Sequence, residues 1–229
     1  MLTEAMRAIL TDARQWGWVL EPEAKRLFAL WGLPVPKFTW ARDIGEALRF
    51  AEEIGYPVAA KVVSPEVVHK SEVKGVVAGI GGREKLEEVF TRFRALPGFE
   101  GVLVEEMAEG LELIVGAKVD HQFGPVILFG IGGTGVEIYK DSVLRMAPLT
   151  EKDVEAMLTG LQARPLLEGY RGRDPVDRQG LTRFLLDFSR LVMTLEERIT
   201  SIDINPLFCS SKGCIAADAR VMLPSFEGA

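Results

Sequence analysis

The sequence predicts an α+β protein of two lobes, each built around its own sheet. Segments with apolar residues at helical spacing alternate with short runs rich in Val and Ala, which are typical of buried strands. With 229 residues and a hydrophobic content of 48%, the chain is long enough for two modest lobes with a real core. Two lobes in succession leave a cleft between them, and we expect the ligand to bind there.

Helices are expected at the N-terminus. Apolar positions recur at helical spacing over residues 3–15, and a second helix is predicted from Pro22 to Trp31. Proline suits the first turn of a helix, and Gly32 provides a stop. Residues 1–18 are therefore predicted to form an N-terminal helical arm.

The first lobe is predicted to span residues 19–106. After the second helix, strands and helices alternate, interrupted by the polar segment SPEVVHKSEVKG. The expected elements are an extended segment over residues 33–41, a helix over 41–55, strands over 56–63 and 76–80, a helix over 83–96 and a strand over 102–106.

The second lobe is predicted to span residues 107–229. A glycine-rich segment, GIGGTG, follows one of its apolar runs, and a Ser-Ser-Lys-Gly turn joins its last two strands. The expected elements are strands over residues 112–119 and 126–130, strands near Val136 and Leu144, helices over 150–158 and 179–194, and short strands over 200–204 and 214–219.

The composition argues against several classes of function. The net charge is −6, from 27 basic against 33 acidic residues, and no Lys/Arg block is present, so nucleic acid is not an expected partner. The N-terminus lacks an apolar signal core, and no stretch reaches about 18 uninterrupted apolar residues, so a membrane is not expected either. The predicted location is the cytoplasm, with Cys209 and Cys214 as reduced thiols.

Lys61 and His69 are candidates for phosphate chemistry. Lys61 lies inside the apolar run 57–63, where a buried ammonium is costly unless its head reaches a cleft or an anion. A lysine that extends from the strand end into solvent is the structural alternative. His69 follows in a polar segment that could cover phosphates, although an ordinary turn with an exposed histidine accounts for its composition equally well.

Acidic residues and glycines follow the first lobe. Glu105 and Glu106 end one strand and Glu112 begins the next, so a carboxylate there could face a ribose, or these acids could simply be solvated. The segment GIGGTGVEIYKD could cradle an anion with its backbone N–H groups, or it could form a tight turn. It matches neither the Walker nor the Rossmann glycine pattern.

Three oxygen-bearing side chains are predicted to converge near the C-terminus. Asp203 and Asn205 share one face of a strand because side chains alternate, and Asp218 lies on the strand after the turn. Hard oxygen donors without cysteine or histidine suit Mg²⁺, which shares its remaining sites with waters and nucleotide phosphates. Surface acids around an Asn-Pro turn are the alternative, but DINP lies between apolar runs, where unpaired polar groups are costly.

Four segments occur in a specific order: EAKRLFALWGLPVP, GYPVAAKVVSPEVVHKSEVKGVV, VLVEEMAEGLELIVGAKVDHQFGPVILFGIGGTGVE, and IDINPLF followed by ADAR. Together they resemble the ATP-grasp subunit or domain of nucleoside-diphosphate-forming acyl-CoA synthetases, a superfamily that includes succinyl-CoA synthetase and ADP-forming acetyl-CoA synthetase. Two residues depart from the family pattern, Lys74 where a glycine is expected and His121 where proline is usual.

The resemblance implies an ATP-grasp fold whose two lobes hold ATP or ADP between them. It implies that Lys61 contacts the nucleotide phosphates, that the strand edge formed by Glu105, Glu106 and Met107 receives the base, and that Glu112 meets the ribose.

The resemblance also implies a metal site and a phosphoryl carrier. Asn205 and Asp218 are implied as Mg²⁺ ligands, and His69 is similar to the second phosphohistidine of the acetyl-CoA synthetase branch. Asp203 matches the acid that orients a phosphohistidine near the nucleotide.

The implied reaction converts acyl-CoA, phosphate and ADP into acid, CoA and ATP. It needs a CoA-binding alpha subunit with its own catalytic histidine, for which 229 residues leave no room, and an α2β2 assembly is expected. Two alternatives are a free-standing ATP-grasp ligase that activates an acid for attack by an amine, and a subunit that binds ATP without turnover. The acyl group and the choice of ATP or GTP are not readable from this chain.

Overall fold

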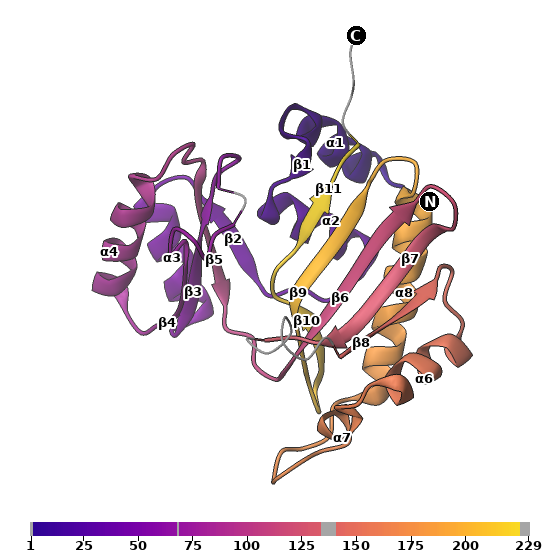
Figure 1. Ribbon diagram of the computed structural model, residues 1–229. Helices are drawn as coiled ribbons and strands as arrows, with labels where there is room; N and C mark the ends of the chain where they lie inside the picture. The colour runs from indigo at the N-terminus through magenta and orange to yellow at the C-terminus, as the bar shows by residue number, and fades with distance from the viewer. Residues whose placement is uncertain (1, 68, 134–140, 225–229) are drawn as a thin grey trace. The chain divides into compact units, whose positions relative to one another are not determined.

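The computed structural model describes residues 2–67, 69–133 and 141–224, and the chain divides into two compact units (Figure 1). The segment 23–35, expected in the first lobe, folds with the larger unit because Ala24, Leu27 and Phe28 pack in the core of that unit. The larger unit comprises Met1–Val19, Glu23–Val35 and Glu109–Ala229, and the smaller unit comprises Leu20–Pro22 and Pro36–Ala108.

The smaller unit contains an antiparallel sheet of four strands in the order β2-β5-β3-β4, with two helices. These elements confirm those that the sequence predicts for this part of the chain. They are β2 (Phe38–Ala41), α3 (Ile44–Ile54), β3 (Val58–Val63), β4 (Val76–Ile80), α4 (Arg83–Arg94) and β5 (Gly101–Glu106).

One face of this sheet packs against α3 and α4. Val58, Ala60 and Val62 of β3 share that face, since side chains alternate along a strand, and they join one core with apolar residues of both helices. Ala59 and Lys61 therefore point to the other face of the sheet. The alternation directs a lysine away from the helical core.

The larger unit contains an antiparallel sheet in the order β1-β11-β9-β6-β7-β8, with β10 paired to β9 (Figure 1). The long helix α8 packs against β7 and β10 and buries Phe184 and Phe188 in the core. The elements are α1 (Glu4–Asp12), the 3₁₀ helix η1 (Ala13–Trp16), β1 (Trp18–Val19), α2 (Glu21–Trp31, whose first two residues belong to the smaller unit), β6 (Leu111–Asp120), β7 (Gly124–Ile131), β8 (Ser142–Met146), α6 (Glu151–Gly160), α7 (Arg164–Leu167), α8 (Arg178–Leu195), β9 (Ser201–Ser210), β10 (Gly213–Ala216) and β11 (Arg220–Met222).

Capping residues explain where several helices begin. The carboxylate of Asp43 accepts a hydrogen bond from the first turn of α3, and that of Asp177 does the same for α8. Thr150 and Asp153 form a capping box at the start of α6. Gly32, which ends α2, has a φ of 97°, a conformation that favours glycine.

Strand β9 contains a bulge. Asn205 and Pro206 together face the position of Ile114 on β6, because the register shifts between Leu113 and Val115. The buried face of β9 changes from even-numbered to odd-numbered residues at this point, so that both halves of the strand still point into the core. The buried side chains are Ile202, Ile204, Leu207 and Cys209.

The C-terminal strands differ from the prediction in length. The strand expected over 200–204 continues to Ser210, since Pro206 sits in the bulge and does not end the pairing. The short strands β1 and β11 pair with each other and were not predicted. The strand expected near Val136 lies outside the described residues. None of the described helices is both long and apolar enough to cross a membrane.

Cys209 and Cys214 are joined by a disulfide, so the prediction of reduced thiols is wrong for this structure. The two residues are direct partners across the β9–β10 hairpin, with their Cα atoms 4.2 Å apart. A spacing of five residues in the sequence does not reveal this pairing, because it depends on the register of the hairpin.

Candidate functional site

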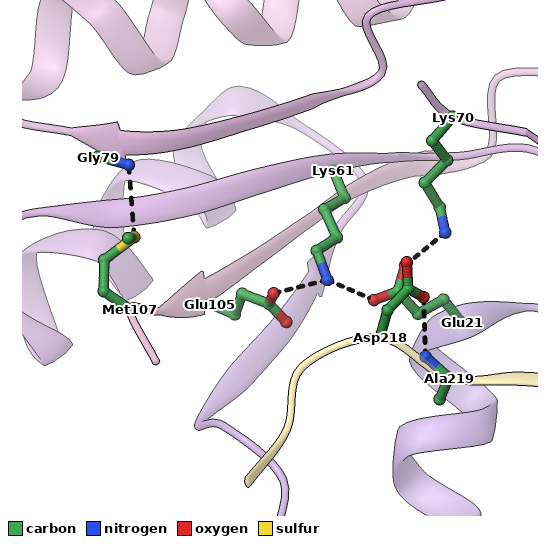
Figure 2. A network of polar contacts seen from close by, with 8 residues as sticks. All are labelled: Glu21, Lys61, Lys70, Gly79, Glu105, Met107, Asp218 and Ala219. Atoms are coloured by element: carbon green, nitrogen blue, oxygen red, sulfur yellow. Dashed lines mark hydrogen bonds and ion pairs between the residues drawn. The ribbon is translucent and has the colours of Figure 1, made fainter. Parts of the chain in front are cut away.

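Lys61 lies at the centre of a buried charge network in the smaller unit (Figure 2). Its Nζ lies 2.7 Å from Oε1 of Glu21 and 2.9 Å from Oε1 of Glu105. Glu105 shares a sheet face with Lys61, since it is paired with Ala59 across β5 and β3. The lysine head therefore does not extend into solvent, and two carboxylates offset the cost of burying its charge.

The segment after β3 carries His69 and Lys70, whose side chains differ in exposure. His69 is exposed, whereas Nζ of Lys70 lies 2.6 Å from Oε2 of Glu21 (Figure 2). Glu21 thus contacts both Lys61 and Lys70. Lys74, where the family resemblance expects glycine, has a φ of 50°, in the left-handed region that favours glycine.

The strand edge predicted to receive a base is partly occupied by contacts within the protein. Oε1 of Glu106 accepts a hydrogen bond of 3.0 Å from the backbone N–H of Lys37, and Sδ of Met107 accepts one of 3.3 Å from the N–H of Gly79. The side chain of Glu105 contacts Lys61 instead of the edge. A role for Glu105, Glu106 and Met107 in base binding stays a prediction.

Glu112 begins β6 in the larger unit and is exposed, beside the start of the glycine loop. Its backbone carbonyl accepts a hydrogen bond of 2.8 Å from the N–H of Gly132. A Cβ atom on Gly133 would lie 3.0 Å from Oε2 of Glu112, so a glycine leaves room for this carboxylate. Residues 134–140 of the predicted anion loop lie outside the described residues.

Asp203, Asn205 and Asp218 belong to neighbouring segments of the larger unit. The bulge places Asn205 at an exposed position of β9, while Asp203 is half-buried beside Arg220, its partner on β11. The N–H of Ala217 donates a hydrogen bond of 3.0 Å to the carbonyl of Pro206, which holds the segment before Asp218 next to the bulge. The strand predicted over 214–219 ends at Ala216, so Asp218 lies between β10 and β11, and a shared site for the three side chains stays a prediction.

The electrostatics of this region fit a cation. Burial raises the pKa of Asp203 above its ordinary value, Arg220 opposes that rise, and the charge of Asp218 adds to it. The carboxylates of Asp203 and Asp218 and the amide oxygen of Asn205 are hard donors of the kind that Mg²⁺ prefers. Among residues 2–67, 69–133 and 141–224, no group of three or more His, Cys, Asp or Glu side chains could hold a metal ion by itself.

Three residues of these networks are not apparent from the sequence: Glu21, Lys70 and Arg220. Each is one charged residue among many. Glu21 and Lys61 are separated by 40 positions, so their contact depends on the fold. The only available signal was the position of Glu21 directly before the helix-starting Pro22.

Replacing Asp203 by asparagine should raise the free energy of unfolding of the metal-free protein at pH 7. The raised pKa of Asp203 means that the folded state holds its proton more tightly than the unfolded state. Above the pKa that Asp203 has in the folded protein, its ionised carboxylate therefore lowers the free energy of unfolding. This loss of stability disappears at acidic pH. Denaturant unfolding with a chelator should show a gain in the free energy of unfolding for Asp203→Asn that shrinks as the pH is lowered towards 3.8, the ordinary pKa of aspartate. A gain independent of pH would contradict the assignment.

A family model described as an ATP-grasp domain matches residues 10–223. The beta subunit of ADP-forming acetate–CoA ligase II from Pyrococcus furiosus is 43% identical over 215 residues, covering 90% of this chain and 91% of that subunit. ADP-forming acetate–CoA ligase II from Archaeoglobus fulgidus is 38% identical over 206 residues, covering 90% of this chain and 30% of that protein.

A similar solved structure is that of acetyl-coenzyme A synthetase 1 from Ca. Korarchaeum cryptofilum, in complex with coenzyme A and Mg-AMPPCP. It has a TM-score of 0.84 and a sequence identity of 36%, and the match covers 96% of this chain and 100% of that chain. In that structure, a phosphohistidine segment points towards the nucleotide-binding site.

Proposed function

The chain belongs to the ATP-grasp domain family as a nucleotide-binding beta subunit of an ADP-forming acyl-CoA synthetase, and we propose that His69 carries the phosphoryl group in its reaction. The ATP-grasp fold, the ligase class and the use of ATP or ADP with Mg²⁺ agree with the sequence prediction. The other two functions considered, an amine ligase and a subunit without turnover, lack support from the relatives.

The observation that carries the proposal is an exposed imidazole on the segment that follows β3, the strand that contains Lys61. His69 is exposed eight residues after the buried Lys61, and the side chain of Lys70 is tied to the same carboxylate as Lys61. An exposed side chain on a short segment can reach a phosphoryl donor.

The proposed chemistry is two displacements at one phosphorus atom. A neutral imidazole nitrogen of His69 attacks the phosphorus carried by the histidine of the partner, which forms a new N–P bond and breaks the N–P bond to that histidine. A terminal oxygen of ADP then attacks the same phosphorus, which breaks the N–P bond and forms ATP. In this proposal Lys61 neutralises phosphate charge, and Asp203 is available to orient an imidazole.

We further propose that Asn205 and Asp218 hold Mg²⁺, that Glu112 meets the ribose, and that the edge of Glu105–Met107 receives the base. Magnesium, when bound, supplies charge neutralisation at the phosphates. These roles rest on the donor set around the β9 bulge and on the exposed carboxylate of Glu112.

A partner alpha subunit belongs to the assembly, since close relatives are named beta subunits and others are much longer single chains. We propose that this partner binds CoA, carries a histidine of its own and forms an α2β2 complex with the chain. We propose acyl phosphate formation from acyl-CoA on the partner, followed by transfer to its histidine and then to His69. The cytoplasmic location stays a prediction.

The test of the proposed function is labelling with γ-labelled ATP in the presence of the partner. The chain contains only two histidines, His69 and His121, so peptide mapping separates them. We expect acid-labile, base-stable label on His69. Label on the partner alone would mean that phosphate passes directly between the partner and ADP.

Replacing Lys61 by alanine should remove most of the stabilisation that Mg-ADP gives to the protein. It also leaves the carboxylates of Glu21 and Glu105 buried without this cation, so the ligand-free variant should melt at a lower temperature than wild type. Thermal melts with and without Mg-ADP separate the two effects, because the ligand-induced shift depends on affinity. A matched control is Lys25→Ala, a fully buried lysine of α2, which should melt lower but keep the full shift. If Lys61→Ala also keeps the full shift, Lys61 is structural.

A further inference from the structure

Glu21 links two parts of the candidate site through one carboxylate. Each of its oxygens lies within ion-pair distance of a different lysine, Lys61 on β3 and Lys70 beside His69 (Figure 2). The side chain of Glu21 is 1% exposed, and those of Lys61 and Lys70 are 8% and 13% exposed. Solvent therefore screens these contacts weakly, and their geometry is well defined.

Lys70 is held by its backbone as well as by its side chain. Its carbonyl accepts a hydrogen bond of 2.7 Å from the N–H of Gly75, and the carbonyl of Gly75 accepts one of 2.8 Å from the N–H of Val62 on β3. These two hydrogen bonds join the ends of residues 70–75 to each other and to β3. The exposed His69 directly precedes Lys70, so the contact between Lys70 and Glu21 restrains the residue next to the imidazole.

We propose that Glu21 is a positioning residue for phosphoryl transfer, which holds Lys61 in place and, through Lys70, fixes the orientation of the His69 segment. This inference rests on the proposed role of His69 as the carrier. Neither Glu21 nor Lys70 touches the transferred group in this scheme. Their contribution is alignment, and misalignment by about 1 Å can lower a rate by about a hundred-fold.

Lys70→Met tests the positioning role, since it removes the charge that contacts Glu21 and leaves both ion pairs of Lys61. The rate of labelling of His69 from γ-labelled ATP should fall by at least about ten-fold. The Kd for Mg-ADP should change by less than about two-fold, which a general loss of structure would not allow. Lys70→Arg should restore most of the rate, because arginine can reach the same carboxylate.

Lys74→Met is the matched control. Lys74 is a lysine of the same segment, and its backbone carbonyl accepts a hydrogen bond of 3.0 Å from Arg92. This substitution removes a positive charge from the segment and leaves the contact between Lys70 and Glu21 intact. A loss of labelling in Lys74→Met equal to that in Lys70→Met would show that charge alone matters and would overturn the inference.

A double-mutant cycle tests whether Lys70 acts through Glu21. Glu21→Gln should weaken Mg-ADP binding and reduce labelling, because it also loosens Lys61. Adding Lys70→Met to Glu21→Gln should lower labelling by less than about two-fold more, as expected for two residues of one interaction. A full additional ten-fold loss would mean that Lys70 acts independently of Glu21.

Hydrogen exchange of residues 71–75 separates failure of this inference from failure of the proposed function. The backbone N–H groups of Lys74 and Gly75 have no role in phosphoryl transfer. Their exchange rates report only on whether the hydrogen bonds of this segment are intact. Faster hydrogen exchange in Lys70→Met, combined with no label on His69 in the wild type, would support the contact between Lys70 and Glu21 as a restraint on this segment. It would reject His69 as the phosphoryl carrier. Label on His69 in the wild type, combined with unchanged hydrogen exchange and an unchanged labelling rate in Lys70→Met, would reject only the positioning role of the contact between Lys70 and Glu21.

Discussion

Replacing His69 by alanine should reduce phosphoryl exchange between ATP and the partner by at least about a thousand-fold, while the Kd for Mg-ADP stays within about two-fold of wild type. The nucleophile is lost, whereas Lys61 and its two carboxylates do not depend on the imidazole. Because His69 is exposed, the free energy of unfolding should change little. Rapid-quench measurement of the label on the chain, with calorimetric titration of Mg-ADP, gives both quantities.

His121→Ala is the matched control for this experiment. His121 is the other histidine of the chain and is also exposed, in the turn between β6 and β7. Its removal should leave exchange unchanged. Full exchange by His69→Ala would show that His69 only borders the site and that phosphate reaches ADP without a carrier on this subunit.

Removing a predicted magnesium ligand should have the largest effect on nucleotide binding. Asn205→Ala and Asp218→Ala should each raise the Kd for Mg-ADP by at least about a hundred-fold, since each removes an oxygen donor from the ion that neutralises the phosphates. Asn205 is also the only asparagine in the sequence, and it stands at the bulge of β9. Calorimetric titration with Mg-ADP measures the effect.

Two further variants control for the metal assignment. Asp174→Ala removes an exposed acid of the same unit and should bind Mg-ADP normally. Asn205→Asp keeps an oxygen donor and should retain most of the affinity. Wild-type affinity in both alanine variants would place the metal elsewhere.

The helices and long strands were predictable because each has several turns or pleats of regular apolar spacing. Strands β1 and β11 have only two and three residues, too few to show a period, and they are defined by pairing, of β11 with β9 and of β1 with β11. Strand β9 was predicted too short because Asn205-Pro206 has the composition of a turn. Only the register with β6 reveals that the pairing continues beyond the bulge.

The candidate site was predictable where residue type and strand alternation suffice. Asp203 and Asn205 could be placed on one face, and Lys61 could be identified because a charge inside an apolar run needs a partner. The partners themselves were not predictable. Glu21 and Glu105 meet Lys61 from positions 40 and 44 residues away, and no local pattern records that contact.

The bulge in β9 also limits how the chain can change in length. Deleting Pro206 alone would leave Ile202, Ile204, Leu207 and Cys209 at alternate positions of a regular strand, so all four could stay in the core. Deleting both Asn205 and Pro206 would make Ile204 and Leu207 neighbours on opposite faces, so one half of the strand would have to turn its two apolar side chains out of the core. Exposing two such side chains would cost several kcal/mol, at about 1.5–3 kcal/mol for each. A deletion library screened for folded protein should therefore contain single-residue gaps at the bulge and lack the two-residue gap.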